Sequence, residues 1–156
     1  MDYKLYLRVG DIVKNKETEQ LLNMLNKIND KSKLNKYIYS STEEEENLSL
    51  DEYITRICKS KGLSKSDIIK NADLYRTYGY EILSGKKNPS RDKLLQICIG
   101  NDFSLEQANR SLTLAKLGVL YAKNPKDSIV IFALNNSLSL MDTNLILHDH
   151  DLDILE

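Results

Sequence analysis

Apolar residues recur at helical spacing along most of the chain, and turn-forming residues separate the runs. Between residues 48 and 117 this pattern predicts five short helices joined by tight turns. Serines stand where four of these helices begin, at Ser49, Ser64, Ser90 and Ser104. A serine there accepts hydrogen bonds from the first unpaired backbone N–H groups. Glu52 and Gln107 stand at the reciprocal positions of two capping boxes.

The ends of the predicted helices are marked equally clearly. Gly62 is expected to end the first helix in a left-handed conformation. The third helix is expected from Arg76 to Ser84, with Gly85 as its stop. The fourth is expected to bury one face before it stops at Gly100, and that face comprises Leu94, Leu95, Ile97 and Cys98.

The flanking segments suggest three regions: a leader over 1–47, the main domain over 48–117 and a helical extension over 118–156. In the leader, 18–28 has the stripe of an amphipathic helix. Polar residues and four glutamates at 43–46 follow, which indicates a solvated linker. The alternative is that these glutamates mimic phosphate and shield a basic surface.

The extension is expected to contain two helices. Asn124 and Pro125 form a cap and a first-turn proline, and 129–134 is apolar on all sides, which predicts a buried helix. With 2 prolines and 6 glycines in 156 residues, the fold class is predicted to be all-α.

Overall charge gives little attraction to nucleic acid, because 22 basic and 23 acidic residues leave a net charge of -1. Basic residues do gather in the middle of the chain, so any such attraction must be local. Cys58 and Cys98 lie among apolar neighbours and are expected to be buried free thiols. We expect a cytoplasmic protein, since no signal peptide or membrane-spanning run is apparent.

Candidate chemistry is sparse. His148, His150 and the neighbouring aspartates resemble metal ligands, but alternate residues of a helix do not converge on one ion. A frayed acidic C-terminus is the favoured interpretation. We find no nucleophile turn and no phosphate-binding glycine loop. The chain is therefore expected to be a non-enzyme without cofactor or metal.

One segment carries a resemblance to a known family. Residues 62–90, GLSKSDIIKNADLYRTYGYEILSGKKNPS, resemble the Cro/lambda-repressor-like (XRE) helix-turn-helix domain. The matching positions are Gly62, Leu63, Ser64, Ala72, Leu74, Ile82, Gly85, Asn88 and Pro89. The wider chain resembles a bacterial subgroup with a short leader and two extra C-terminal helices. The resemblance implies a lambda-repressor-like five-helix bundle.

In that family the third helix lies in the major groove of DNA, and the second crosses the backbone above it. Carried over by position, the residues implied to face the bases are Arg76, Thr77, Tyr80, Glu81 and Ser84. Those implied to contact the DNA backbone are Lys65, Lys86, Lys87 and Asn88. Three positions depart from the family pattern: Lys65, Tyr75 and Gly79.

Individual roles follow from side-chain chemistry. Arg76 suits guanine, with an ion pair to Glu81 as the alternative; Glu81 suits cytosine or orients Arg76. Lys86 and Lys87 suit phosphate, with a solvated loop as the alternative. Gly79 is expected to allow close approach of the second and third helices.

The resemblance implies a sequence-specific double-stranded DNA-binding protein, a transcriptional regulator of a bacterium or its mobile elements. One helix-turn-helix makes few contacts, so a homodimer on a two-fold site is expected. The competing hypothesis is a protein–protein adaptor that uses the same bundle. Near-neutral charge, Glu81 and the tyrosines around the third helix favour this protein partner.

Overall fold

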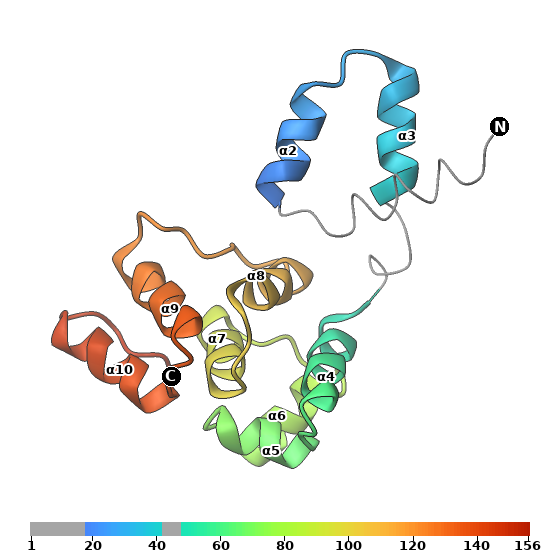
Figure 1. Ribbon diagram of the computed structural model, residues 1–156. Coiled ribbons are helices and arrows are strands. Elements are labelled where there is room, and N and C mark those ends of the chain that lie inside the picture. The colour runs from blue at the N-terminus through green and yellow to red at the C-terminus, as the bar shows by residue number, and fades with distance from the viewer. Residues whose placement is uncertain (1–17, 42–47) are drawn as a thin grey trace. The chain divides into compact units, whose positions relative to one another are not determined.

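A computed structural model describes residues 18–41 and 48–156, and the regular secondary structure of these residues is helical throughout (Figure 1). The predicted all-α class is thereby confirmed for these residues. The chain divides into two compact units, residues 1–48 and residues 49–156.

In the first unit, α2 (Thr18–Asn26) matches the expected amphipathic helix. The second helix, α3 (Lys31–Ser41), lies where the sequence pattern indicated a polar linker, so that prediction was wrong. An aspartate starts this helix: Asp30 Oδ1 accepts a hydrogen bond from the Lys33 backbone N–H at 2.8 Å. The glutamates at 43–46 lie outside the described residues, and both interpretations of them stay predictions.

The second unit contains helices at the five expected places and two more after them. They are α4 (Leu50–Ser60), α5 (Lys65–Asn71), α6 (Arg76–Leu83), α7 (Arg91–Gly100), α8 (Leu105–Leu114), α9 (Pro125–Asn135) and α10 (Leu140–Asp149). Ser49 and Ser104 form the predicted capping boxes, and Ser64 forms a third with Asp67. Asn124 caps α9, with Pro125 in its first turn.

One corner motif recurs between the helices. Gly62 has a φ of +72°, the next residue is apolar, and Ser64 then caps the following helix. Asp102-Phe103-Ser104 and Ser137-Leu138-Ser139 repeat this order with φ values of +54° and +50°. The apolar residue closes the preceding helix through its backbone N–H, as from Phe103 to the Cys98 carbonyl at 2.9 Å. Three residues therefore end one helix and begin the next.

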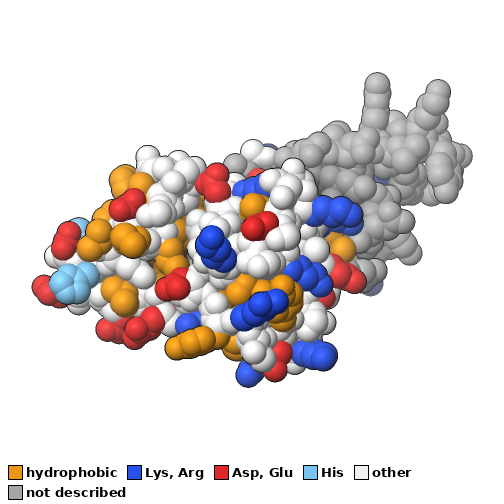
Figure 2. Space-filling view, turned by 90° about the horizontal axis from the view of Figure 1, so that it is seen from below, with side chains coloured by type: hydrophobic (Ala, Val, Ile, Leu, Met, Phe, Trp, Pro, Cys, Tyr) orange, Lys and Arg blue, Asp and Glu red, His pale blue; other side chains and the backbone are white. Residues whose placement is uncertain are grey.

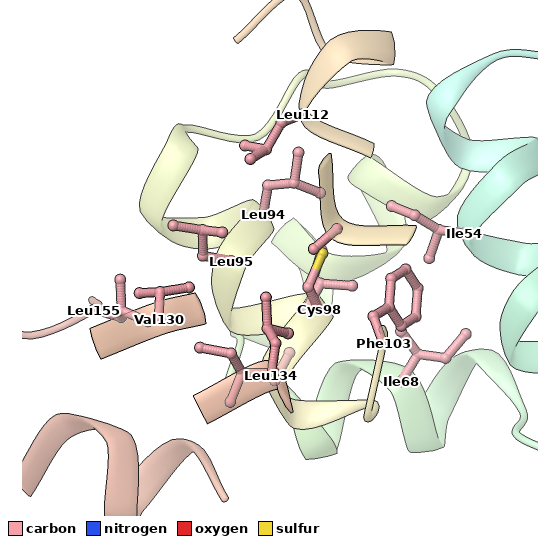
Figure 3. Packing of buried hydrophobic residues seen from close by; sticks show 14 of the residues in the cluster. Ile54, Ile68, Leu94, Leu95, Cys98, Phe103, Leu112, Val130, Leu134 and Leu155 are labelled. Atoms are coloured by element: carbon pink, nitrogen blue, oxygen red, sulfur yellow. The ribbon is translucent and has the colours of Figure 1, made fainter. Parts of the chain in front are cut away.

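The core of the second unit is built around α7 (Figure 3). All residues from 94 to 99 are buried, including Gln96 and Ile99. Helices α5, α8, α9 and α10 all pack against α7. The expectation that α7 buries a single face was therefore too narrow, because this helix is enclosed by its neighbours.

Two further expectations need correction. The apolar run in α9 was expected to be buried on all sides, but Phe132 is 53% exposed, because α9 packs on the core through Val130, Ala133 and Leu134. The C-terminus was expected to fray, but Leu155 is buried. Its backbone N–H and C=O bond to the Asn144 side chain at 2.9 and 3.2 Å.

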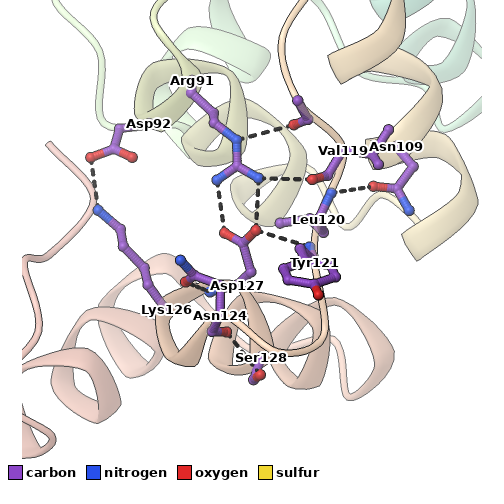
Figure 4. A network of polar contacts seen from close by, with 11 residues as sticks. Arg91, Asp92, Asn109, Val119, Leu120, Tyr121, Asn124, Lys126, Asp127 and Ser128 are labelled. Atoms are coloured by element: carbon purple, nitrogen blue, oxygen red, sulfur yellow. Dashed lines mark hydrogen bonds and ion pairs between the residues drawn. The ribbon is translucent and has the colours of Figure 1, made fainter.

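A half-buried ion pair joins the N-terminal end of α7 to that of α9 (Figure 4). Arg91 holds both carboxylate oxygens of Asp127, at 2.7 and 2.9 Å. The same guanidinium donates to the carbonyl oxygens of Gly118 and Val119, at 3.1 and 3.2 Å. Asp127 also accepts from the Tyr121 backbone N–H at 2.9 Å. One bidentate pair thus ties the 115–124 loop and α9 to α7.

Burial by itself raises the pKa of Asp127, but the hydrogen bonds from Arg91 and Tyr121, with the charges of Arg91 and Lys126, lower it overall. A carboxyl with a lowered pKa stabilises the fold while it is ionised. That contribution is present above the ordinary aspartate pKa of ~3.9 and is lost as the pH falls through the folded-state value.

We predict that Asp127→Asn lowers the free energy of unfolding by about 3 kcal/mol at pH 7, because it leaves Arg91 without its carboxylate. Unfolding by urea, measured from neutral pH to ~3, should show a shallower acid-induced loss in the variant than in the wild-type protein. Asp149→Asn, at a position 75% exposed in its side chain, is the control and should behave like wild type. Parallel pH profiles for Asp127→Asn and wild type would contradict the assignment.

Candidate nucleic-acid interface

Helices α5 and α6 meet at a tight turn made of residues 72–75. Ala72 ends α5, Asp73 has a left-handed backbone with a φ of +52°, and the Leu74 N–H bonds to the Ile69 carbonyl at 3.2 Å. Leu74 packs against the core, and α6 begins directly after Tyr75. The chain therefore changes direction between the two helices within these four residues.

The C-terminal end of α7 holds this turn from the inside. The Gln96 side chain donates to the Ala72 carbonyl at 3.3 Å, and Asn101 donates to the Ile68 carbonyl at 3.2 Å. A Cβ atom added to Gly100 would lie 2.1 Å from the Asn71 carbonyl oxygen. Only glycine permits this backbone contact, so the path of α5 into the turn is fixed by α7.

Gly79 allows α6 to lie close against α5, as the sequence suggested. A Cβ atom added there would lie 2.6 and 2.8 Å from the two γ carbons of Ile69. Ile69 is buried and branches at its β carbon, so both branches fill the space that a side chain at position 79 would need. The inner face of α6 is completed by Ile82 and Leu83, both buried.

The opposite face of α6 points to solvent and carries the five residues implied to read bases. Arg76, Thr77 and Ser84 are exposed. Tyr80 and Glu81 are partly exposed. These positions share one side of a helix because Arg76, Tyr80 and Ser84 follow one another at intervals of four, as do Thr77 and Glu81; Ser84 is the C-cap rather than a helical residue.

The residues implied to contact a DNA backbone flank this face. Lys65 is exposed in the first turn of α5, and Lys86, Lys87 and Asn88 are exposed in the loop between α6 and α7. Figure 2 shows lysine and arginine side chains, with a few acidic ones among them, over the side of the second unit away from α10. Acidic and histidine side chains gather over the α10 end in the same view.

Side chains on and beside α6 hold one another in place. The Arg76 guanidinium lies 5.7 Å from the centre of the Tyr80 ring, and Lys87 Nζ lies 5.3 Å from that of Tyr78. Lys87 also pairs with Glu81 at 3.6 Å. The sequence analysis considered an ion pair between Arg76 and Glu81. In the structure, Glu81 pairs with Lys87 of the following loop instead.

A shallow depression lies between α5 and α6, and sequence reasoning did not find two of its residues, Ser66 and Lys70. Its lining comprises Ser66, Ile69, Lys70, Leu74, Arg76 and Tyr80. The i, i+4 spacing of Ser66 and Lys70 was the available signal, because it places them on one side of α5. The depression therefore extends the exposed surface from α6 onto α5.

Other chemistry within the described residues is limited. Cys58 and Cys98 are free and buried, as predicted, and burial raises their pKa values to about 11 and about 12, so both stay protonated near neutral pH. No grouping of three or more potential metal ligands occurs in 18–41 or 48–156. Across those same ranges, every helix is too short or too polar to cross a bilayer.

Comparison of the chain with known protein families, with curated proteins and with solved structures finds no match. The helix-turn-helix assignment and the roles of its residues therefore stay predictions, supported by sequence resemblance and by the geometry described above.

We predict that Gly79→Ala destabilises the fold by about 1–3 kcal/mol, because the added methyl group overlaps Ile69. An ordinary glycine-to-alanine change inside a helix gives the opposite sign, a gain of ~1 kcal/mol. In an Ile69→Ala background the space is open, so the same change should then stabilise. Urea unfolding of the four proteins measures this coupling.

Gly118→Ala is the matched control, because no atom lies within 4 Å of a Cβ added there. Its free energy of unfolding should be close to that of wild type. If Gly79→Ala stabilised the otherwise unaltered protein, the close contact between α5 and α6 would be refuted.

Proposed function

We propose that this protein binds double-stranded DNA in a sequence-specific manner and acts as a bacterial transcriptional regulator, with α6 reading the major groove. The observation that carries the proposal is the outer face of α6. Arg76, Thr77 and Ser84 are exposed there, while Gly79, Ile82 and Leu83 are buried on the opposite side.

The shape of this surface suits a groove. A major groove about 12 Å wide admits one helix. The outer face of α6 is exposed to solvent, and Lys86 and Lys87 follow its C-terminal end. Arg76 can offer two parallel hydrogen bonds to guanine, and Thr77 can offer a hydroxyl or a methyl group. The cation–π contact between Arg76 and Tyr80 favours one position of the guanidinium before DNA is bound.

The charge distribution supports backbone contacts on both sides of α6. Lys65 lies at the start of α5, where the positive end of that short helix adds to its charge, and Lys86 and Lys87 lie after α6. Phosphate contacts of this kind set the register of a protein on a duplex. A homodimer on a two-fold site is part of the proposal, since one such unit makes few contacts.

The alternative is that the same surface binds a protein, as in the adaptor hypothesis. It is favoured by the ion pair between Lys87 and Glu81, which lowers the positive charge available to phosphate. Selection from a pool of random duplexes at low salt separates the two functions. Enrichment of a common sequence supports DNA binding, whereas no enrichment would sink it and leave the adaptor.

We predict that Arg76→Ala relaxes the base preference at one position of the selected duplex, with a loss there of about 1–3 kcal/mol. Lys86→Ala should instead weaken binding to all duplexes alike and reduce the slope of log K against log salt by about one. Fluorescence anisotropy with single-base duplex variants at several salt concentrations measures both effects.

Lys123→Ala is the matched control for charge, because Lys123 is an exposed lysine in the 115–124 loop, away from α6. It should leave affinity and salt slope unchanged. A uniform loss of affinity for Arg76→Ala on every duplex would remove Arg76 from the base-reading residues.

A further inference from the structure

Helix α6 begins differently from the other helices of the second unit. The N-cap side chains of the other six accept a hydrogen bond from a backbone N–H of the first turn, and they are Ser49, Ser64, Ser90, Ser104, Asn124 and Ser139. The N-cap of α6 is Tyr75, whose side chain makes no capping hydrogen bond. Its backbone is extended, with φ −60° and ψ 136°, which is the conformation that a serine cap adopts.

This start lowers the stability of α6. A tyrosine cannot accept the hydrogen bond from the first turn, and Gly79 in the middle of the helix weakens it further. Because a serine would fit the same backbone, the local geometry does not require tyrosine at position 75. The choice of residue breaks a local rule that every other helix from α4 to α10 follows.

Packing of the Tyr75 side chain does not offset this loss of stability. Its side chain is 88% exposed, the largest value among the exposed large hydrophobic residues of the described ranges. The residue before it, Leu74, packs against the core, while Tyr75 extends into solvent. Exposure alone is ordinary for a single apolar residue, but here it coincides with a missing cap, and tyrosine is among the residues enriched where proteins bind their partners.

The position of Tyr75 specifies what it would meet if the proposed function holds. It stands directly before Arg76, at the end of α6 that leads into the groove. It precedes the helix and so lies outside the face made by Arg76, Thr77 and Tyr80. Its two chain neighbours, Leu74 and Arg76, line the depression between α5 and α6, which Lys70 also lines. A hydroxyl at this edge suits a phosphate rather than a base.

We infer that Tyr75 is a further positioning residue for DNA, whose hydroxyl donates to a backbone phosphate beside the bases that α6 reads. This inference rests on the proposed function and adds a contact that the helix-turn-helix resemblance does not imply. It also accounts for the missing cap, because the side chain at position 75 binds DNA instead of capping α6.

The test uses Tyr75→Ser, which restores a cap and removes the ring. Tm should rise by about 2–5 °C, because the serine can accept from the Tyr78 N–H. Affinity for the selected duplex should fall roughly 5- to 10-fold, equally for all single-base variants of that duplex. A purely structural residue would not give a more stable fold and weaker binding together.

Two further variants sharpen the test. Tyr75→Phe removes the hydroxyl alone and should weaken binding roughly 2- to 5-fold. Tyr121→Ser, at a tyrosine 58% exposed in the 115–124 loop, is the matched control and should leave affinity unchanged. Wild-type affinity in both Tyr75 variants would overturn the inference while DNA binding stands. Failure of the wild-type protein to select any duplex would instead remove the proposed function, and this inference with it.

Discussion

The close approach of α7 to the C-terminal end of α5 controls how α6 is presented. At Gly100 there is no room for a side chain, since a Cβ atom would lie 2.1 Å from the Asn71 carbonyl oxygen. Gln96 and Asn101 hydrogen-bond to carbonyls of the same region. Because α7 is itself enclosed by α5, α8, α9 and α10, these contacts connect the turn before α6 to the centre of the core. The orientation of α6 therefore depends on the entire second unit.

This dependence explains how α6 can be locally weak. It has eight residues, no side-chain cap and a central glycine, and a segment of that length does not form a stable helix alone. Ile82 and Leu83 anchor it from the inside, and Gly79 receives Ile69 from α5. Since tertiary packing on one side stabilises the helix, the exposed residues Arg76, Thr77 and Ser84 on the other side are little constrained by the fold. Tyr80 is the exception on that side, because its side chain packs partly against the core.

Local signals were sufficient for most of the fold but not for its long-range contacts. Serine caps and glycine stops predicted most of the boundaries of the helices from α4 to α8, because capping depends on a few adjacent residues. The helix α3 escaped detection, since its starting cap, Asp30, precedes a segment with a weak apolar stripe. The pair between Arg91 and Asp127 joins positions 36 residues apart, and nothing local marks it. Helical spacing likewise predicts which residues lie on the outer face of α6. It does not predict the ion pair between Glu81 and Lys87, because Lys87 lies in the loop after the helix.

The near-neutral net charge of the chain does not show which cations are accessible to a ligand, because some of them are bound within the fold. Arg91 is bound to a side chain only 6% exposed, and Lys61 donates to the carbonyl oxygens of Asn101 and Asp102, so both serve the fold. Lys87 and Glu81 are 56% and 41% exposed, and a pair in such a setting is worth ~1 kcal/mol or less. A phosphate can therefore replace Glu81 as the partner of Lys87 at small cost. The net charge includes cations held within the fold, such as Arg91 and Lys61, as well as exposed ones, such as Lys87. Only the exposed cations can bind a polyanion.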